Sequence, residues 1–388
     1  NPPASLAEAT DQLEALLEAA VTERMSPSGQ TIAFLSGGVD SSLLCALAAR
    51  HAPERVKAIT VGFEDADFDE SKVAVTVAQH LGIEHQVLGF SMSTYRAGFE
   101  RLAAGIAYPS ADPAGLPTLL SFEVAGQTAT CALDGTGADT LFGVMPARHQ
   151  RLAVELGTLL PRPLRRLATR LLTRLPGLRG YAPLVDFDDP EEVLIRWRGW
   201  SRRELEHLCG EPVSLSHTRF YQQFRTFPRD AHLDRYSTLL GGLPDDRIHQ
   251  AAQLTGLDVR LPYVDRSVTD WVEGLRVDLR FHPDEPKRVL KAVLERHVPR
   301  RLWDHPKHGF DFPFLRLMKA DDYALVRRYL DPAVTSPWGL FEETQIQASK
   351  EALIGADNCS AFSVNSPAFR TWALVVLFAW LEHHCQHV

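Results

Sequence analysis

Several features that would place a chain in a common class of proteins are scarce or missing in this sequence. The five cysteines are scattered, odd in number and without a CxxC pair, which argues against a zinc site or a disulfide framework and fits a reducing cytosol. Positive charge is not in excess, because the formal net charge is −8. A general nucleic-acid-binding protein is therefore not expected.

Long apolar runs and leader signals are missing as well. No run approaches the roughly 18–20 apolar residues of a membrane span. The first residues show no basic segment followed by an apolar core, as a signal peptide has. We therefore expect a cytoplasmic protein without a transmembrane segment. With 388 residues, 45% of them hydrophobic, the chain can bury a large core.

The most informative stretch that is present is a strand, a glycine turn and a helix in direct succession. Residues 31–35 (TIAFL) form a short apolar run that predicts a buried strand. The turn Ser-Gly-Gly follows at 36–38, and residues 39–47 predict a helix with Asp40 in its first turn. Such a turn directs several backbone N–H groups to one place. Together with the positive end of the helix dipole, they predict a site for a phosphate-sized anion.

The side chains of this loop also suit a nucleotide. Glycine permits close approach of an anion and a positive φ. Asp40 offers a hard oxygen ligand for the magnesium that accompanies polyphosphate. A bare Gly-Gly turn is usually an ordinary connection, but the full string SGGVDSS after a strand favours a binding loop. The Walker A pattern GxxxxGK[ST] is absent. Hydroxyl donors are expected from Ser36, Ser41 and Ser42.

Strands and helices alternate over about the first 140 residues. This alternation predicts a parallel sheet covered by helices on both faces, with the ligand at the carboxyl ends of the strands. From about residue 145 the strand signals fade, so the fold class expected is α/β with a mostly helical C-terminal half. The expected elements are helices at 6–24, 39–47, 71–81 and 369–381 and strands at 31–35, 56–63, 85–90 and 129–133.

Three further charged residues are candidates for a nucleotide site. Asp139 follows a glycine turn at 134–138 and is suited to hold magnesium together with Asp40. Lys287 lies just inside a predicted helix start, and Lys307 lies in a loop rich in proline and glycine. Lysines that reach a polyphosphate neutralise the charge that grows on leaving pyrophosphate. Taken singly, each of them is more often a solvated surface group.

Residues 245–265 contain a second group of charges. Asp246 lies in an Asp-Asp-Arg run, and Arg260 lies in the segment LDVRLPYVD at 257–265. Charged residues interrupted by Leu-Pro-Tyr do not fit a plain helix face. A buried structural ion pair is the alternative to a substrate-binding role there.

The stretch 161–180 carries six arginines among leucines at near-helical intervals. One interpretation is a solvated pair of helices bounded by prolines. The other is a basic amphipathic surface for an anionic partner or a membrane face. Both remain open at this point.

Taken together, these pieces resemble the synthetase domain of asparagine synthetase and its relatives, the β-lactam synthetases and lasso-peptide cyclases, in the N-type ATP pyrophosphatase superfamily. The resemblance implies an adenine nucleotide alpha hydrolase-like fold for 31–388, with a nucleotide-binding part to about 145 and a mostly helical part at 146–388 that completes the site. Residues 1–30 are then an N-terminal helix and linker. The matching motifs are FLSGGVDSS (34–42), ITVGFED (59–65), FDES (68–71), DGTGADTLFG (134–143), DDR (245–247), VRLPYVD (259–265), Lys287 and KHGFDFP (307–313).

The resemblance also implies roles for individual residues. The SGGVDSS loop is expected to bind pyrophosphate, Asp40 and Asp139 to hold magnesium, and the strand at 59–63 to offer its edge to adenine. Lys307 matches the lysine that stabilises the adenylation and acyl-transfer transition states in the family. The expected ATP contacts are Leu35, Ser36, Gly37, Gly38, Asp40, Ser41, Val61, Phe63, Gly135, Lys287 and Lys307. The expected catalytic residues are Lys307, Asp246 and Lys287, with Thr136 and Arg260 as expected substrate contacts.

Two departures from the family pattern bear on the substrate. Asparagine synthetases have Glu, and β-lactam synthetases Tyr, at the place of Thr136, and both are proposed to help deprotonate the attacking nitrogen. A threonine hydroxyl cannot serve as a base at neutral pH. The candidates for the base are then Asp246, which falls at the dyad carboxylate of β-lactam synthetases, a group of the substrate, and the phosphate. The N-terminal glutaminase domain that family members usually carry is not in this sequence, so we expect either a stand-alone synthetase or a fragment.

The sequence therefore predicts an ATP- and Mg²⁺-dependent, AMP-forming amide ligase. Its expected partners are a small-molecule or peptide carboxylate and an amine, with intramolecular closure in specialised metabolism as one option. A separate glutaminase or carrier partner is left open, and no nucleic acid is expected. The alternatives are an amidotransferase whose glutaminase domain lies outside this sequence, a nucleobase-modifying enzyme with the same loop, and a non-catalytic nucleotide-binding protein.

Overall fold

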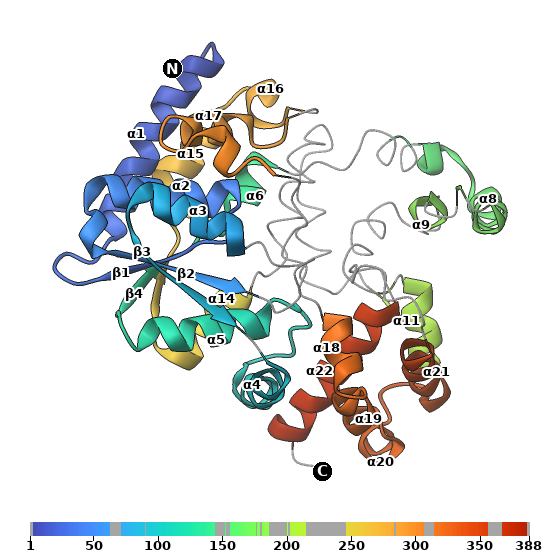
Figure 1. Ribbon diagram of the computed structural model, residues 1–388. Helices are drawn as coiled ribbons and strands as arrows, with labels where there is room; N and C mark the ends of the chain where they lie inside the picture. The colour runs from blue at the N-terminus through green and yellow to red at the C-terminus, as the bar shows by residue number, and fades with distance from the viewer. Residues whose placement is uncertain are drawn as a thin grey trace. The chain divides into compact units, whose positions relative to one another are not determined.

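The structure is a computed structural model, and its chain divides into two compact units that are described separately here (Figure 1). Unit 1 comprises Asn1–Val144 and Pro244–Leu317, and unit 2 comprises Met145–Leu243 and Met318–Val388. The residues that the structure describes are 3–62, 71–89, 91–143, 152, 156–175, 177–178, 181–185, 200, 202–214, 246–282, 285–305, 314–355 and 367–385.

Unit 1 is built on a sheet of parallel strands in the order β3-β2-β1-β4-β5. The chain runs outward from β1 to β2 and β3 and then returns to the other side of β1 with β4. The strand order therefore reverses between β1 and β4, which is where open α/β sheets bind ligands. The strands are β1 (Thr31–Phe34), β2 (Val56–Gly62), β3 (Glu84–Gly89), β4 (Cys131–Leu133) and β5 (Asp258–Arg260).

The alternation of side chains along β1 assigns the two faces of the sheet. Phe34 points to one face, where its ring stacks on Phe122 with the centroids 4.9 Å apart. Ala33 and Leu35 point to the other face and belong to the same buried cluster as Leu43. Because successive strand residues face opposite sides, the apolar run at 31–35 is explained by burial on both faces.

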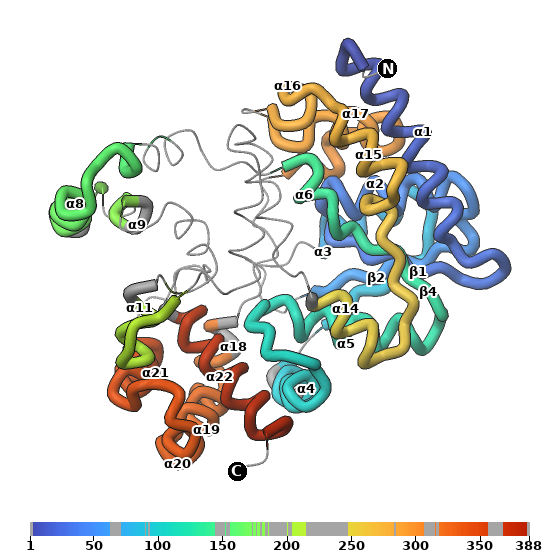
Figure 2. The backbone as a smooth tube through the Cα atoms, turned by 180° about the vertical axis from the view of Figure 1, so that it is seen from behind, coloured from blue at the N-terminus to red at the C-terminus, as the bar shows by residue number. Residues whose placement is uncertain are grey.

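Helices cover both of these faces (Figures 1 and 2). Helices α1, α2, α3, α15 and α17 share one buried cluster, and α4, α5 and α14 pack together on the other side. Their bounds are α1 (Leu6–Arg24), α2 (Val39–His51), α3 (Ser71–Leu81), α4 (Met92–Gly105), α5 (Gly115–Gly126), α6 (Ala138–Phe142), α14 (Asp246–Thr255), α15 (Arg266–Glu273), α16 (Val277–Arg280) and α17 (Arg288–Glu295). Short 3₁₀ turns are η1 (Pro53–Arg55), η5 (Pro262–Val264) and η6 (Arg300–Leu302).

The described part of unit 2 is helical. Helix α22 packs against α19 and α21, α21 also contacts α11, and α8 packs against α9. No helix among the described residues combines the length and the apolar character needed to cross a membrane. The helices are α8 (Arg162–Arg174), α9 (Ala182–Val185), α11 (Arg202–Cys209), α19 (Ala324–Tyr329), α20 (Pro332–Thr335), α21 (Glu343–Ile354) and α22 (Pro367–His384), with η7 (Ser336–Trp338) and with α18 (Phe314–Ala320) across the boundary of the two units.

The predicted fold class, a parallel sheet flanked by helices with a mostly helical C-terminal half, is confirmed. The predicted bounds of α1 and α3 agree with the structure. The first of these starts where expected because Ser5 Oγ accepts the N–H of Glu8 (3.2 Å), and the Glu8 carboxylate accepts the N–H of Ala4 (2.9 Å).

Two features of unit 1 were not predicted. Strand β5 lies in the half expected to be helical, and its three residues include two charged ones, Asp258 and Arg260. A strand so short, at the edge of a sheet, gives no alternating pattern to recognise. In addition, α1 packs against α2 and α17, and Pro244–Leu317 belong to unit 1 together with Asn1–Val144. The division into an N-terminal segment at 1–30 and a synthetase domain at 31–388 stays a prediction.

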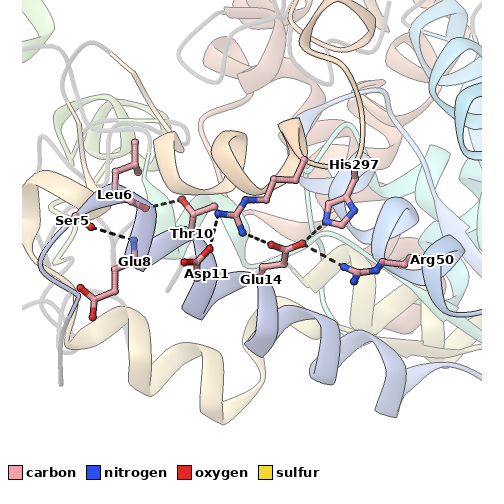
Figure 3. A network of polar contacts seen from close by, with 9 residues as sticks. Ser5, Leu6, Glu8, Thr10, Asp11, Glu14, Arg50 and His297 are labelled. Atoms are coloured by element: carbon pink, nitrogen blue, oxygen red, sulfur yellow. Dashed lines mark hydrogen bonds and ion pairs between the residues drawn. The ribbon is translucent and has the colours of Figure 1, made fainter.

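Glu14 connects three helices of unit 1 through a group of charges in which its own carboxylate is poorly exposed (Figure 3). Its carboxylate on α1 accepts hydrogen bonds from Arg296 Nη1 (2.5 Å) and His297 Nε2 (2.8 Å), and Arg50 Nη1 on α2 lies 3.5 Å away. Arg296 also pairs with Asp11 at 2.6 Å. Glu14 therefore fixes the C-terminal end of α17 to α1 and α2.

We expect Glu14→Gln to lower the free energy of unfolding by about 2 kcal/mol, because hydrogen bonds to a charged, poorly exposed carboxylate contribute more than neutral ones. Glu18→Gln is the matched control, since Glu18 on the same helix lies 3.7 Å from Arg50 and is far more exposed. That change should stay within about 0.5 kcal/mol. Urea unfolding measures both, and equal losses would contradict the assignment.

Candidate active site

The loop after β1 and the turn after β4 meet at the carboxyl ends of these neighbouring strands. They touch directly, because a Cβ placed on Gly135 would lie 3.5 Å from both Asp40 Cβ and Ser41 N. The sequence separates these two segments by about a hundred residues, and the parallel pairing of β1 with β4 brings them together. The switch point of the sheet therefore carries both of the predicted loops.

Gly37 is required by the backbone and by packing. Its φ is +80°, and a Cβ there would lie 3.0 Å from Val73 Cγ1 and 3.2 Å from Ala74 N. The neighbour that excludes a side chain is thus α3. The sequence suggested another reason for a glycine at this position, the close approach of an anion. The contact with α3 does not test that reason.

Two serines close the loop on itself. Ser41 Oγ accepts the N–H of Ser36 (3.1 Å) and lies 3.0 Å from Ser36 Oγ, which accepts the N–H of Gly38 at 3.4 Å. Helix α2 begins after Gly38 without a side-chain cap. The positive end of this helix therefore faces the loop, an arrangement suited to a phosphate group.

Lys287 brings together the two predicted metal ligands. Its ammonium contacts Asp40 Oδ2 and lies 2.6 Å from Asp139 Oδ1. The Lys287 side chain is only 8% exposed, Asp40 13% and Asp139 62%. Burial by itself lowers the pKa of Lys287, but the charges of Asp40 and Asp139 and their hydrogen bonds outweigh it and raise the pKa above its ordinary 10.5. The lysine is therefore a cation.

The backbone of Lys287 is held in an uncommon conformation. With φ 60° and ψ 30° it lies in the left-handed region, directly before α17. For a residue with a side chain this conformation costs about 1–2 kcal/mol. Such strain persists where other contacts fix the residue, and here the ammonium is fixed by two carboxylates from other segments.

Tyr263 is a further residue of this site, which the sequence did not single out. Its hydroxyl donates to the backbone oxygen of Asp40 (3.0 Å), and the side chain is fully buried. Burial first, and then the nearby charges of Asp40 and Asp139, raise the pKa of Tyr263 well above 10, so it is a neutral donor. The motif VRLPYVD contained it, but a tyrosine in a short charged segment shows no pattern of its own.

The donor set suits a magnesium ion. One cation, the Lys287 ammonium, already contacts both Asp40 and Asp139, so both carboxylates can reach a common ion. Hard oxygen donors are the ligands that Mg²⁺ prefers, and it is commonly bound by one or two carboxylates with phosphates and water completing the shell. In the described part of the chain no group of three or more His, Cys, Asp or Glu side chains could hold a metal.

The other predicted residues of the β4 turn lie beside this group. Asp134 Oδ1 accepts the N–H of Thr136 (2.8 Å), so this aspartate shapes the turn. Thr136 itself is half-buried. Gly137 has φ +101°, and a Cβ there would lie 2.6 Å from Val264 Cγ1. The segment that carries Tyr263 thus packs closely on the turn.

The remaining predicted residues lie elsewhere or outside the described residues. Arg260 Nη1 donates to the backbone oxygens of Arg24 (2.8 Å) and Met25 (3.3 Å), at the C-terminal end of α1. Val61 is half-buried near the end of β2. Asp246 is the first residue of α14, and its side chain lies outside the described set. Phe63 and Lys307 lie outside the described residues altogether. These assignments stay predictions.

A buried hydrogen-bonded chain holds the start of the loop. Thr60 Oγ1 donates to the backbone oxygen of Leu35 (2.5 Å), and His85 Nε2 lies 2.7 Å from the same Thr60 oxygen. Because the Thr60 proton is used on Leu35, we assign the proton of the imidazole to Nε2, which donates to Thr60. Burial lowers the pKa of His85 below its ordinary 6.5, which favours this neutral form.

His85 gives the protein a pH-dependent stability. Above about pH 6.5 the imidazole is neutral in the folded and the unfolded chain and contributes nothing. As the pH falls below that value, the unfolded chain takes up a proton that the folded one resists, so stability is lost. We expect urea unfolding at about pH 7.5 and about pH 5.5 to show a smaller loss for His85→Gln than for the unchanged chain. An unchanged loss in His85→Gln would refute this.

Lys287 and Mg²⁺ should compete for the same carboxylates. Lys287→Met leaves the poorly exposed Asp40 without its cation and should destabilise the fold by roughly 3 kcal/mol. Added Mg²⁺ should then raise the melting temperature of the variant more than that of the unchanged chain, because binding to the folded state stabilises it. Lys291→Met, one turn along α17, is the control, and an equal response of all three chains to Mg²⁺ would contradict a shared site.

Comparison with known proteins agrees with this arrangement. The profile of the family described as asparagine synthase matches residues 12–381. A putative glutamine-hydrolyzing asparagine synthetase of Mycobacterium bovis is 30% identical over 325 residues, covering 80% of this chain and 49% of that protein. The glutamine-hydrolyzing asparagine synthetase 1 of Bacillus subtilis is 25% identical over 357 residues, covering 89% of this chain and 55% of that protein.

The chain thus spans about half the length of these curated relatives. Among solved structures, the NMN synthetase of Francisella tularensis is 14% identical with a TM-score of 0.28, and the match covers 66% of this chain and 94% of that one. A likeness this low carries no argument. The family profile covers nearly the whole chain, and its members are ATP-dependent ligases that form C–N bonds. The loop, the paired carboxylates and this match together show that the chain belongs to the asparagine synthase family.

Proposed function

We propose that this chain is an AMP-forming amide ligase that uses ATP to activate a carboxylate. The observation that supports this most is the contact of Lys287 with both Asp40 and Asp139 beside the serine-glycine loop. A helix N-terminus, two carboxylates suited to a metal and a buried lysine occupy one place at the switch point. This set suits a polyphosphate in complex with magnesium.

In the proposed reaction, a carboxylate oxygen of the substrate bonds to the α-phosphorus of ATP, and the bond to the β-phosphate oxygen breaks. Pyrophosphate leaves, and an acyl-adenylate remains. The loop amides and Lys287 are placed to stabilise the negative charge that grows on the leaving group. Bound magnesium would be held by Asp40 and Asp139 and would neutralise part of the phosphate charge.

The second step forms the amide. A nitrogen nucleophile bonds to the acyl carbon, loses a proton and displaces AMP. Thr136 offers no base at neutral pH, so we propose that Asp246 or a group of the substrate takes the proton. We favour an amine over ammonia as the nucleophile, with closure within one peptide or amino-acid substrate as a special case. Lys307 is the proposed second phosphate-facing lysine.

A second function is supported by the curated relatives. They are named glutamine-hydrolyzing asparagine synthetases, and this chain covers about half of their length. The same site could accept ammonia released by a glutaminase, on a separate chain or on a part beyond this sequence. Both functions share the first step and differ in the nucleophile.

The first step can be tested by isotope exchange between pyrophosphate and ATP in the presence of Mg²⁺ and pools of carboxylic acids. We expect Lys287→Met and Asp40→Asn each to lower the exchange rate by about 10²- to 10³-fold, the usual cost of removing one group that stabilises transition-state charge. Lys291→Met should keep the full rate. Calorimetry of Mg·ATP binding to each folded variant separates loss of binding from loss of chemistry. Exchange that survives in Asp40→Asn would overturn the mechanism.

The nucleophile is decided by a competition experiment. With the active acid identified, AMP release is measured with ammonium chloride and with a mixture of amines at the same concentration. A ligase of the proposed kind should prefer the amine by about tenfold or more, which corresponds to roughly 1.4 kcal/mol of discrimination. A preference for ammonium would select the amidotransferase instead. AMP release that needs neither ammonium nor an added amine points to attack from within the substrate.

A further inference from the structure

Helix α8 of unit 2 combines exposed leucines with arginines and contains no acidic residue itself. From residue 156 to residue 178 the chain contains five arginines and no Asp or Glu. Nine of the fifteen large hydrophobic side chains that the described residues expose lie between 152 and 178. All nine are leucines, and Leu159 is 79% exposed. The proposed ligase site uses none of these residues.

The packing of α8 leaves these leucines on a separate face. The side chain of Arg165 is buried, and those of Ala168, Thr169 and Leu172 are half-buried, so the side of the helix that carries them is turned inward. Helix α8 packs against α9, whose Ala182 is buried as well. Burial of α8 within unit 2 is therefore provided by a side of the helix that lacks the exposed leucines.

The exposed leucines form one stripe at helical spacing. Positions 164, 167, 171 and 175 are three or four residues apart and so lie on one side of a helix. Exposed leucines continue beyond the helix at both ends, in the helical residues 156–159 before it and in the turn at 177–178 after it. The leucine–arginine face, as it is called below, consists of Leu156, Leu159, Leu160, Leu164, Leu167, Leu171, Leu175 and Leu178 with the exposed Arg162, Arg166, Arg170 and Arg174.

The arginines occupy the side of α8 next to this stripe. Positions 162, 166, 170 and 174 recur every four residues, and all four side chains are exposed. Guanidinium groups bind phosphate through paired hydrogen bonds, and their carbon chains can lie along an apolar surface. A helix with leucines on one side and arginines on the next is the kind that lies in the interface of a lipid bilayer.

We propose that the leucine–arginine face binds the surface of an anionic lipid bilayer, with the leucines entering the acyl boundary and the arginines at the lipid phosphates. The extent of the apolar surface favours a bilayer over a partner helix. A partner groove accepts one straight stripe of side chains. Leucines from α8 and from the segments on both sides of it need a broad, deformable apolar medium. Because the chain as a whole has a net charge of −8, its electrostatic attraction to an anionic bilayer would come from this face and not from the whole surface.

A second copy of the chain fits this face less well. Two copies of α8 paired by a two-fold axis would place arginines of one beside arginines of the other, because no acidic residue interrupts the stretch. Like charges at such a contact are unfavourable. The proposal does not rest on the ligase function, and its test needs no substrate.

The test is co-sedimentation of the full chain with vesicles of mixed phosphatidylglycerol and phosphatidylcholine, and with vesicles of phosphatidylcholine alone. We expect binding to the mixed vesicles, weakened by added sodium chloride. The double variant Arg166→Gln/Arg174→Gln should lower the partition coefficient about twenty-fold, since each arginine near an anionic surface contributes about fivefold. Leu167→Ser/Leu171→Ser should lower it by a similar factor or more.

A matched control distinguishes binding through the leucine–arginine face from a general effect of positive charge. Arg266→Gln/Arg301→Gln removes the same charge from exposed arginines of unit 1 and should leave the partition coefficient unchanged. Unchanged thermal unfolding of every variant shows that the fold is kept. An equal fall of the partition coefficient in the two double arginine variants would overturn the proposal. Equal binding to vesicles with and without phosphatidylglycerol would overturn it too. The proposal would also be overturned if the chain bound neither kind of vesicle and instead dimerised through the same leucines. Binding of a synthetic helical peptide of leucine and glutamate through these leucines, without vesicle binding, would overturn it as well.

Discussion

The contact of Lys287 with Asp40 and Asp139 is the interaction on which the candidate site depends. The three residues come from the start of α2, the start of α6 and the segment before α17, and the side chains of Lys287 and Asp40 are largely buried, whereas that of Asp139 is 62% exposed. A buried carboxylate is costly unless a cation accompanies it. The site can therefore form only when these three segments, far apart in the sequence, are all folded, and this couples the formation of the site to the folding of unit 1.

Different contacts hold Asp40 and Lys287 in place. Asp40 is fixed at the start of α2, where Tyr263 donates to its backbone oxygen, and Lys287 is fixed by α17, whose far end Glu14 connects to α1. The sheet supplies the frame, since its order reverses between β1 and β4. Rigid strands and helices thus meet at the reversal of the strand order, where only the connecting loops have to carry the residues of the site. A site made in this way is positioned by the fold as a whole.

Much of this could be predicted from the sequence, for reasons that differ between elements. The buried run of β1 and the capped, periodic α1 are local signals, and both gave correct elements. Strand β5 was missed, because its existence depends on an edge supplied by β4. The glycine loop and Asp40 were found from the strand, turn and helix pattern, and Asp139 and Lys287 were candidates whose roles the resemblance to a family then specified. Tyr263 was not, since its role arises from burial against Asp40, and burial between distant segments leaves no mark in either segment.

On the proposed function, the ion group also explains why a lysine stands where a metal is expected. Without nucleotide, Asp40 and Asp139 would repel each other, and the ammonium of Lys287 neutralises one of the two charges. A magnesium ion held by Asp40 and Asp139 would bring a stronger cation to these carboxylates, and the phosphates bound with it would offer Lys287 another anion. A flexible point charge such as an ammonium can exchange partners in this way, whereas a planar guanidinium is fitted to paired acceptors. On this proposal, the same residue would stabilise the paired carboxylates and would also act on the leaving group.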